Sequence, residues 1–290
     1  MFPGCLTALV TPFRNGAVDT KALADLVEEQ IAAGINGLVP CGSTGESATL
    51  SHDEHLTVVR EVIRVARKRV PVIPGTGSNA TAEAVRLTRG AEELGADGAL
   101  LISPYYNRPT QDGIVQHYAA IAEATHLPLI VYNIQARTAS NITTETMARL
   151  AKIPRIIGVK EASGSMSQVL EVLETCGPDF SIWSGDDVVT LPLMASGAIG
   201  VISVASNVVP GRMVELSDAL RGGDLARARR VHAALMPLFR HLFLEVNPIP
   251  VKTALAIMGR CSDELRLPLT PMTAKNRAVL ETTLREQRLV

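Results

Sequence analysis

The stretch GALLISPYYNRPTQDGIVQHYAAIAEATHLPLIVYN, residues 98–133, contains one complete structural unit. Two short apolar runs, GALLISP and LPLIVYN, flank residues 111–125, where apolar side chains recur at i, i+3 and i+4. Such runs are typical of parallel strands buried on both faces, and the periodicity between them is that of a helix. The stretch therefore predicts a strand followed by a helix and a second strand.

The same alternation recurs along the whole chain. The apolar runs are LTALVTPF, GLVPCG, PVIPGTG, GALLISP, LPLIVYN, IIGVKEAS, FSIWSGDD and AIGVISVASN. Helical periodicity covers residues 20–33, 53–68, 81–94, 111–125, 144–152 and 166–176. Eight such units in 290 residues predict an α/β protein with a (β/α)8 TIM barrel rather than an open doubly wound sheet.

The sequence after the eighth apolar run is longer than one covering helix needs. Residues 225–243 and 247–259 have helical character, and we expect the helices to break at Pro237, Pro248 and Pro250. We therefore divide the chain into a catalytic barrel, residues 1–224, and an appended C-terminal helical region, residues 225–290.

Composition points to small-molecule chemistry. The formal charge is −1, so there is no general basic field that would attract nucleic acid or an anionic membrane. No segment approaches 18 consecutive apolar residues, and the N-terminus lacks the basic region of a signal peptide, so we expect a cytoplasmic protein. The scattered cysteines, Cys5, Cys41, Cys176 and Cys261, fit reduced thiols.

Polar residues gather where the predicted strands end, and barrel enzymes place their chemistry at those carboxyl ends. These residues are GSTGES (42–47), SPYY (103–106), Tyr132 with Asn133, Lys160 with Glu161, and SGDD (184–187).

Lys160 is the most informative of these residues. Burial at a strand end disfavours the ammonium form and lowers the pKa, and a neutral amine can attack a ketone. Taken alone, the residue is more often a lysine that snorkels to solvent or pairs with Glu161, and only its neighbours favour the nucleophile. Ser43 and Thr44 offer hydroxyls in a loop suited to a carboxylate, and Arg137 could bind a second carboxylate as a fork.

Nucleotide and metal sites are not indicated. The glycine-rich GTGSN, residues 75–79, lacks the spacing of a dinucleotide or phosphate-binding loop. His52 and His55 lie three apart without a third ligand, so a surface helix is the simpler interpretation, and Asp186 with Asp187 reads as a structural pair. We predict no metal.

In combination, GSTGES, YYNRPTQDG, the YN-x-x-x-RT run from Tyr132 to Thr138, GVKEASG and SGDD resemble the dihydrodipicolinate synthase/N-acetylneuraminate lyase family of class I aldolases. The resemblance runs essentially end to end. Arg137, Thr138 and the NPIPVK segment are similar to the synthase branch rather than to the sialic acid lyases.

The resemblance implies a reaction without a cofactor, in which Lys160 forms a covalent imine with pyruvate. Ser43 and Thr44 would hold the pyruvate carboxylate, and Arg137 that of L-aspartate 4-semialdehyde. The product would be 4-hydroxy-tetrahydrodipicolinate, in lysine and diaminopimelate biosynthesis. Gly185 and Ile202 are further expected substrate contacts.

The resemblance also implies a proton relay and an oligomer. Tyr132 would exchange protons at the imine, Ser43 would pass them on, and Tyr106 of the partner subunit would connect the relay to solvent. We expect a homotetramer built as a dimer of dimers. Because neighbours in an extended segment point to opposite sides, Tyr105 should face away from the active site toward an interface.

Members of the family that lysine inhibits have an effector cleft with similar residues, so L-lysine is an expected effector here. The corresponding residues are Ser47, Ala48, His52, His55, Asn79, Glu83 and Tyr105. Two alternatives stay open: another pyruvate-dependent aldolase or dehydratase acting on a sugar acid or hydroxy-oxo acid, and a catalytically silent barrel with a binding role.

Overall fold

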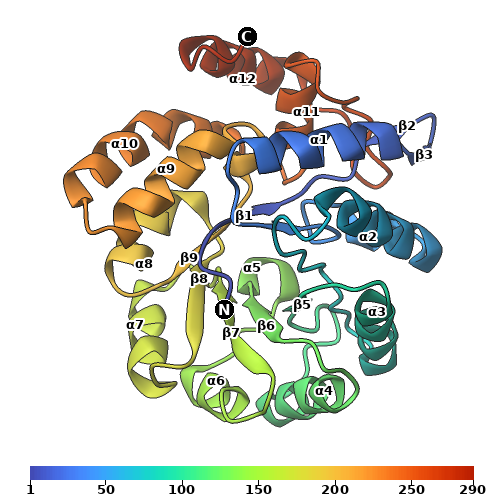
Figure 1. Ribbon diagram of the computed structural model, residues 1–290, viewed down its shortest axis with the longest axis vertical. Helices are drawn as coiled ribbons and strands as arrows, with labels where there is room; N and C mark the ends of the chain where they lie inside the picture. The colour runs from blue at the N-terminus through green and yellow to red at the C-terminus, as the bar shows by residue number, and fades with distance from the viewer.

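The computed structural model describes residues 1–290 and forms a ring of parallel strands surrounded by helices (Figure 1). Seven strands are hydrogen-bonded in the order β4-β1-β9-β8-β7-β6-β5. Their bounds are β1 Gly4–Ala8, β4 Gly37–Val39, β5 Ala99–Ile102, β6 Leu129–Asn133, β7 Ile156–Glu161, β8 Ser181–Ser184 and β9 Gly200–Ser203. A separate antiparallel pair consists of β2 Phe13–Arg14 and β3 Ala17–Val18.

The gap between β4 and β5 is closed by the PVIPGTG segment. It forms two isolated parallel bridges, Leu38 with Val72 and Gly75 with Leu100. Ile73 N donates to the Leu38 carbonyl at 2.8 Å, and Leu100 N donates to the Pro74 carbonyl at 2.9 Å. The prolines of this segment have no N–H to offer, so the ladder is interrupted and the third predicted strand is irregular.

The outer helices follow the predicted alternation, and the six predicted from periodicity end within two residues of the observed bounds. The ring consists of α1 Thr20–Ala32, α2 His52–Ala66, α3 Thr81–Glu93, α4 Gln111–Glu123, α6 Thr144–Leu150, α7 Met166–Thr175, α8 Thr190–Ala195 and α9 Pro210–Arg221. Short helices follow some strands: η1 Ser47–Thr49, α5 Gln135–Thr138, η2 Asp187–Val189 and η3 Ala205–Asn207.

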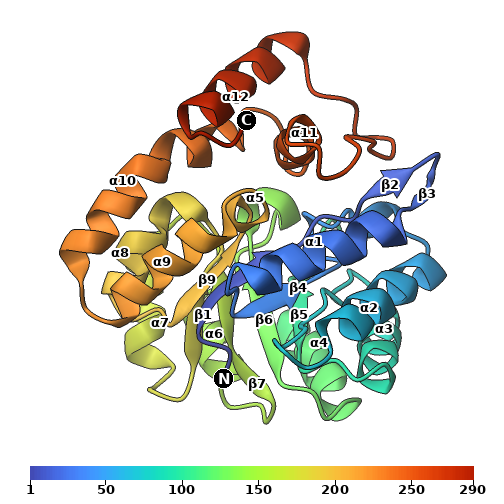
Figure 2. The same ribbon diagram turned by 45° about the horizontal axis from the view of Figure 1, so that its top comes forward.

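The C-terminal helices are α10 Leu225–His241, α11 Ile249–Ile257 and α12 Ala274–Glu286. Figure 2 shows α11 and α12 on the side of the barrel where α5 lies. The predicted break at Pro237 is wrong, because α10 continues through it. The buried side chains of Leu235, Leu238 and Phe239 hold the helix against its neighbours, and this packing outweighs the hydrogen bond that proline removes.

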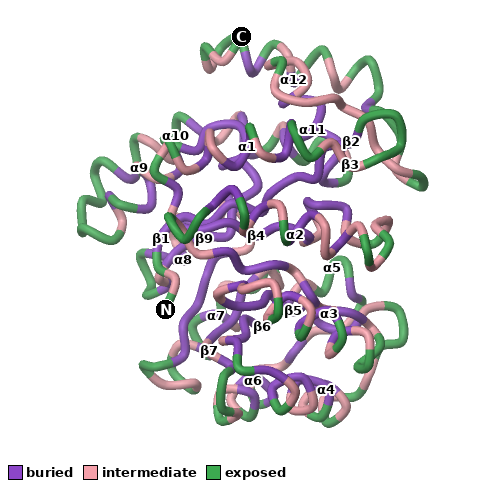
Figure 3. The backbone as a smooth tube through the Cα atoms, turned by 45° about the vertical axis from the view of Figure 1, so that its right-hand side comes forward, coloured by how far each residue is buried: buried purple, intermediate pink, exposed green.

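The buried backbone gathers in the centre of the molecule (Figure 3). A large apolar cluster lies between strands and helices, and a smaller cluster fills the barrel. On β6, Leu129 and Val131 belong to the outer cluster, whereas Ile130 and Tyr132 belong to the inner one. No helix combines the length and the apolar character needed to cross a membrane.

Candidate active site

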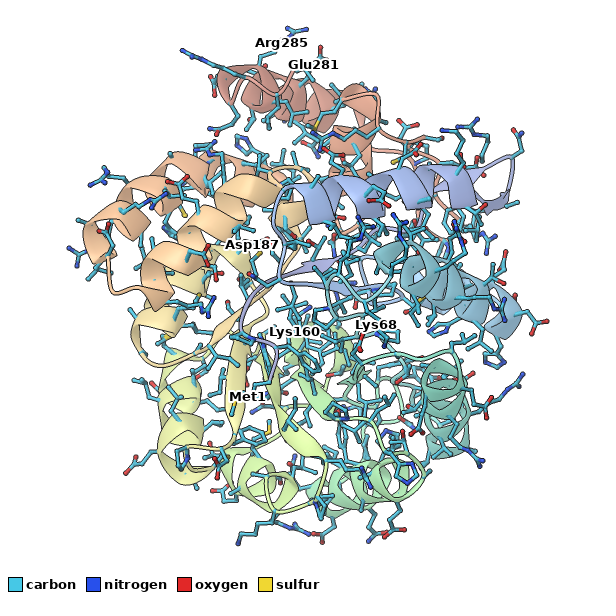
Figure 4. All side chains as sticks on the ribbon, viewed as in Figure 1. Met1, Lys68, Lys160, Asp187, Glu281 and Arg285 are labelled. Atoms are coloured by element: carbon cyan, nitrogen blue, oxygen red, sulfur yellow. The ribbon has the colours of Figure 1, made fainter.

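Lys160 lies inside the barrel near the carboxyl end of β7. The register pairs it with Tyr132 of β6, so both side chains point to the interior. Lys160 is 5% exposed, and its Nζ lies 4.2 Å from the centroid of the Tyr132 ring. Figure 4 shows Lys160 within the ring of strands.

Burial changes the protonation of Lys160. Loss of hydration lowers its pKa from 10.5 to about 8; the Arg137 charge adds to this effect and the Asp187 charge opposes it. About one molecule in ten then carries the neutral amine at pH 7, compared with fewer than about one in a thousand for an ordinary lysine. That fraction of neutral amine is available for attack on a carbonyl carbon at physiological pH.

Tyr132 remains a neutral phenol. Burial raises its pKa to about 12, Asp186 acts in the same direction, and Arg137 and a hydrogen bond with Ser43 partly oppose the shift. A neutral phenol can both donate and accept a proton, as general acid–base chemistry at an amine requires. The Ser43 hydroxyl lines the same cavity.

The GSTGES loop folds tightly at the end of β4. Gly45 N donates to the Gly42 carbonyl at 3.0 Å, and the Thr11 hydroxyl donates to the Gly45 carbonyl at 2.7 Å. A Cβ at Gly45 would lie 2.9 Å from the backbone nitrogen of Cys41, so only glycine fits there. The turn carries Ser43 and Thr44 to the same cavity as Lys160, with a volume of about 60 Å³.

Gly185, one of the other two predicted substrate contacts, lines this cavity. A Cβ at this position would lie 3.2 Å from Lys160 Cε, so glycine leaves room beside the amine. Ile202 is fully buried in the cluster that fills the barrel and does not line the cavity.

Arg137 lies on α5 and lines the cavity. Its Nη2 donates to the backbone carbonyl of Asn247 at 2.9 Å. The Asn247 side chain also reaches the site: its Nδ2 donates to the Thr44 hydroxyl at 2.9 Å, and its Oδ1 is buried without a partner. Sequence reasoning did not assign Asn247 to the site, although the NPIPVK motif that begins with it was noted.

Tyr105 and Tyr106 do not lie in an extended segment. Tyr106 has φ 71°, and Asn107 N donates to the Tyr105 carbonyl at 2.9 Å, which makes a three-residue γ-turn. Tyr106 is 89% exposed, whereas Tyr105 lines a cavity that Tyr132 and Ser43 also line. Tyr105 does not line the smaller cavity with Lys160, so its orientation away from that cavity stays a prediction, although the turn removes the alternation on which it relied.

That larger cavity has a volume of about 410 Å³. It is lined by six of the seven expected effector residues: Ser47, Ala48, His52, His55, Glu83 and Tyr105. Asn79 does not line it, although its carbonyl accepts a hydrogen bond from Asn107 Nδ2 at 2.8 Å.

Two ionisable groups of this cavity, Glu83 and His52, contact each other. Glu83 contacts His52 Nε2 at 2.6 Å and the Ser78 hydroxyl, and Ser78 and then His52 lower the pKa of Glu83. The surface interpretation is wrong for His55, which is 3% exposed and whose Nε2 lies 2.8 Å from the Gly75 carbonyl.

Asp187 has a structural environment. Its Oδ2 accepts from Val204 N at 3.1 Å and from Ala205 N at 2.8 Å. Burial raises the pKa of Asp187 to about 6, so the carboxylate is largely ionised at pH 7. Its negative charge favours the ammonium form of Lys160 and partly offsets the effect of burial on the Lys160 pKa. No three His, Cys, Asp or Glu side chains form a group that could hold a metal ion.

Comparison with known proteins matches this geometry to a family. Two relatives, both named 4-hydroxy-tetrahydrodipicolinate synthase, come from Nitratidesulfovibrio vulgaris strain DP4 and Geobacter sulfurreducens. The first is 57% identical, with 98% of this chain and 97% of the relative covered. The second is 54% identical, with both chains covered completely.

Solved structures agree along the whole chain. A dihydrodipicolinate synthase from Aquifex aeolicus has a TM-score of 0.98 and 47% identity over 99% of both chains. The chloride-inhibited enzyme from Acinetobacter baumannii, complexed with pyruvate, has a TM-score of 0.98 and 44% identity over 100% of both. The enzyme from Cyanidioschyzon merolae, with lysine bound, has a TM-score of 0.97 and 40% identity over 100% of this chain and 99% of that one.

A family model described as the dihydrodipicolinate synthetase family matches residues 1–287. With relatives more than half identical over nearly the full length and a barrel that superimposes on the family's solved structures, this chain belongs to the dihydrodipicolinate synthetase family.

Proposed function

We propose that this chain is a 4-hydroxy-tetrahydrodipicolinate synthase that joins pyruvate to L-aspartate 4-semialdehyde through an imine on Lys160. The observation that carries the proposal is the buried Lys160 amine, with its pKa lowered to about 8, beside the neutral phenol of Tyr132. The names of the relatives and the pyruvate complex of the Acinetobacter baumannii enzyme support the choice of substrates.

The chemistry proceeds through covalent intermediates. Lys160 Nζ adds to the ketone carbon of pyruvate and water leaves, which gives the imine. Loss of a methyl proton gives an enamine, whose carbon forms a bond to the aldehyde carbon while the aldehyde oxygen takes up a proton. The amino group of the semialdehyde then displaces Lys160 from the former ketone carbon and closes the ring.

The neighbouring side chains have separate roles in this proposal. Ser43 and Thr44 bind the pyruvate carboxylate, and Gly185 leaves space beside the amine. Tyr132 exchanges protons at the imine and passes them through Ser43, which lines the same cavity. Arg137 binds the carboxylate of the aldehyde substrate.

Borohydride reduction tests the imine. Added with pyruvate, it should attach the substrate carbons permanently to Lys160 and abolish activity, as peptide mass spectrometry would show. At fixed pyruvate the rate of trapping should rise with pH through about 8, because only the neutral amine attacks. An adduct on another lysine, or no adduct, would exclude this mechanism.

Aldehyde specificity is tested separately. With pyruvate held constant, L-aspartate 4-semialdehyde should be turned over faster than sugar-derived aldehydes. Preference for a sugar aldehyde would keep the imine chemistry and favour the alternative aldolase.

We further propose that L-lysine inhibits the enzyme from the 410 Å³ cavity. Glu83 offers a carboxylate to an ammonium group, and Tyr105 offers a hydroxyl to a carboxylate. The lysine complex of the Cyanidioschyzon merolae enzyme supports the choice of ligand.

Titration of activity with L-lysine at fixed pyruvate tests this regulation. Inhibition should appear at millimolar lysine and weaken by about tenfold in Glu83→Thr, within the usual range of allosteric coupling. Unchanged activity in the wild type, or equal sensitivity in the variant, would show that the cavity has another role.

A further inference from the structure

Glu46 and Lys252 form a buried ion pair that the proposed chemistry does not use. Lys252 Nζ lies 2.6 Å from Glu46 Oε1, and the two side chains are 0% and 1% exposed. The residues are 206 positions apart: Glu46 belongs to the GSTGES loop and Lys252 to α11. The pair therefore joins the carboxyl end of the barrel to the C-terminal region.

Both groups of the pair have further partners. Glu46 Oε2 accepts from the backbone N–H of Arg266 at 3.2 Å. Lys252 Nζ also donates to the Glu264 carbonyl at 2.5 Å and lies 4.3 Å from the centroid of the Phe13 ring. Removing two charges from water costs several kcal/mol per ion, so such a pair is weak support for stability and calls for another explanation.

The conformation of Glu46 suggests what the pair does. Its φ of 53° and ψ of 36° place it in the left-handed region, which is unfavourable for a residue with a side chain. Glu46 N donates to the Ser43 carbonyl at 3.2 Å, so the turn that presents Ser43 and Thr44 closes on Glu46 itself. The ion pair holds that turn in place.

The loop receives a second contact from the same region. Asn247 Nδ2 donates to the Thr44 hydroxyl, and Asn247 precedes Lys252 by five residues. Thr44 is therefore held by a residue just before α11, and Glu46 by α11 itself. These two contacts fix the residues on which the Ser43 and Thr44 hydroxyls depend: one binds the Thr44 hydroxyl directly, and the other holds Glu46, whose N–H binds the Ser43 carbonyl.

We propose that Glu46 and Lys252 are positioning residues for pyruvate, which hold the loop so that the Ser43 and Thr44 hydroxyls meet the substrate carboxylate. This inference rests on the proposed function, because it assigns those hydroxyls to pyruvate. A loop released from the pair binds pyruvate less tightly, whereas the Lys160 amine and the bound aldehyde are unaffected.

The experiment measures borohydride trapping at Lys160 as a function of pyruvate concentration. In the double variant Glu46→Gln/Lys252→Met, which leaves no unpaired buried charge, half-saturating pyruvate should rise about tenfold or more, equivalent to about 1.4 kcal/mol. Trapping at saturating pyruvate, the Michaelis constant for the aldehyde and the melting temperature should stay close to the wild-type values.

Arg260→Met is the matched control. Arg260 pairs with Glu29 of α1 at 2.8 Å, so it also ties the C-terminal region to the barrel, but away from the loop. This variant should leave half-saturating pyruvate unchanged. Glu46→Gln/Lys252→Gln, which replaces both charges with amides and keeps an oxygen for Arg266 N, serves if the first double variant does not fold.

Two results would overturn the inference: wild-type half-saturation in the variant that lacks the pair, or an equal rise in Arg260→Met. Absence of any adduct in the wild type would instead contradict the proposed function. The two failures are therefore distinguishable.

Discussion

At the scale of single residues, the site depends on placing a lysine where a lysine is unfavourable. Lys160 is buried, and its pKa falls from 10.5 to about 8 because the ammonium loses its hydration. Between about pH 8 and pH 10.5, Lys160 is protonated in the unfolded chain and neutral in the folded chain, so the free energy of unfolding rises with pH in that range. Below about pH 8 the folded protein bears the full penalty, about 3 kcal/mol.

Lys160→Met should therefore stabilise the protein at pH 7 while abolishing activity. We expect a gain of about 1–3 kcal/mol in the free energy of unfolding, because methionine fills much of the same space without a charge. Denaturant unfolding at pH 7 measures it, and Lys152→Met, at an exposed position, should produce no change. A less stable Lys160→Met would show that the ammonium is well accommodated in the fold.

At the scale of elements, β6 and α5 act together. Only Ile134 separates the end of β6 from α5, so the helix carries Arg137 back over the end of the strand that bears Tyr132. One guanidinium nitrogen is held by the Asn247 carbonyl, which orients the fork above the cavity. Six consecutive residues, 132–137, thus place a phenol and a guanidinium at one cavity.

Arg137→Ala should raise the Michaelis constant for the aldehyde by about tenfold or more and change that for pyruvate much less, since one carboxylate contact is lost. Arg137→Lys should lie between the two, because it keeps the charge without the fork. Steady-state kinetics with each substrate varied in turn measures the difference. Equal effects on both substrates would place Arg137 elsewhere and favour the sugar-acid alternative.

At the scale of the whole molecule, the relay proposed here is incomplete in one chain. Lys160, Tyr132 and Ser43 meet in the barrel, whereas Tyr106 is 89% exposed on a strained turn. The strained backbone of Tyr106 holds its side chain in solvent, and this costly arrangement has a function if the phenol reaches the active site of a second copy of the chain. The expected homotetramer would supply this copy.

Subunit mixing tests this arrangement. Tyr106→Phe should lower turnover by about 100-fold, the usual effect of a positioned proton-transfer group. Co-expressed with Lys160→Met, it should regain activity, because a mixed dimer has one site with an intact Lys160 and the partner subunit's Tyr106. If the mixture is no more active than either variant alone, Tyr106 does not act in the active site of the partner subunit.

Local patterns predicted much of this molecule. The apolar runs located the seven regular strands, and the helical repeats located six of the outer helices. Strands buried on both faces are continuously apolar, and helices buried along one stripe repeat every three to four residues. Lys160, Tyr132 and the GSTGES loop could be recognised because the chemistry of a barrel lies where its strands end.

Tertiary structure alone decided how distant parts of the chain complete the site. Asn247 reaches Thr44 and Lys252 reaches Glu46 from about 200 residues away, and no periodicity in the sequence encodes those contacts. Packing also carries α10 through Pro237, and a γ-turn directs Tyr105 and Tyr106 against the expected alternation. The sequence by itself determined the elements and the burial of Lys160, because both follow from local apolar patterns. The positioning of the loop depends on surfaces that meet only in the folded protein.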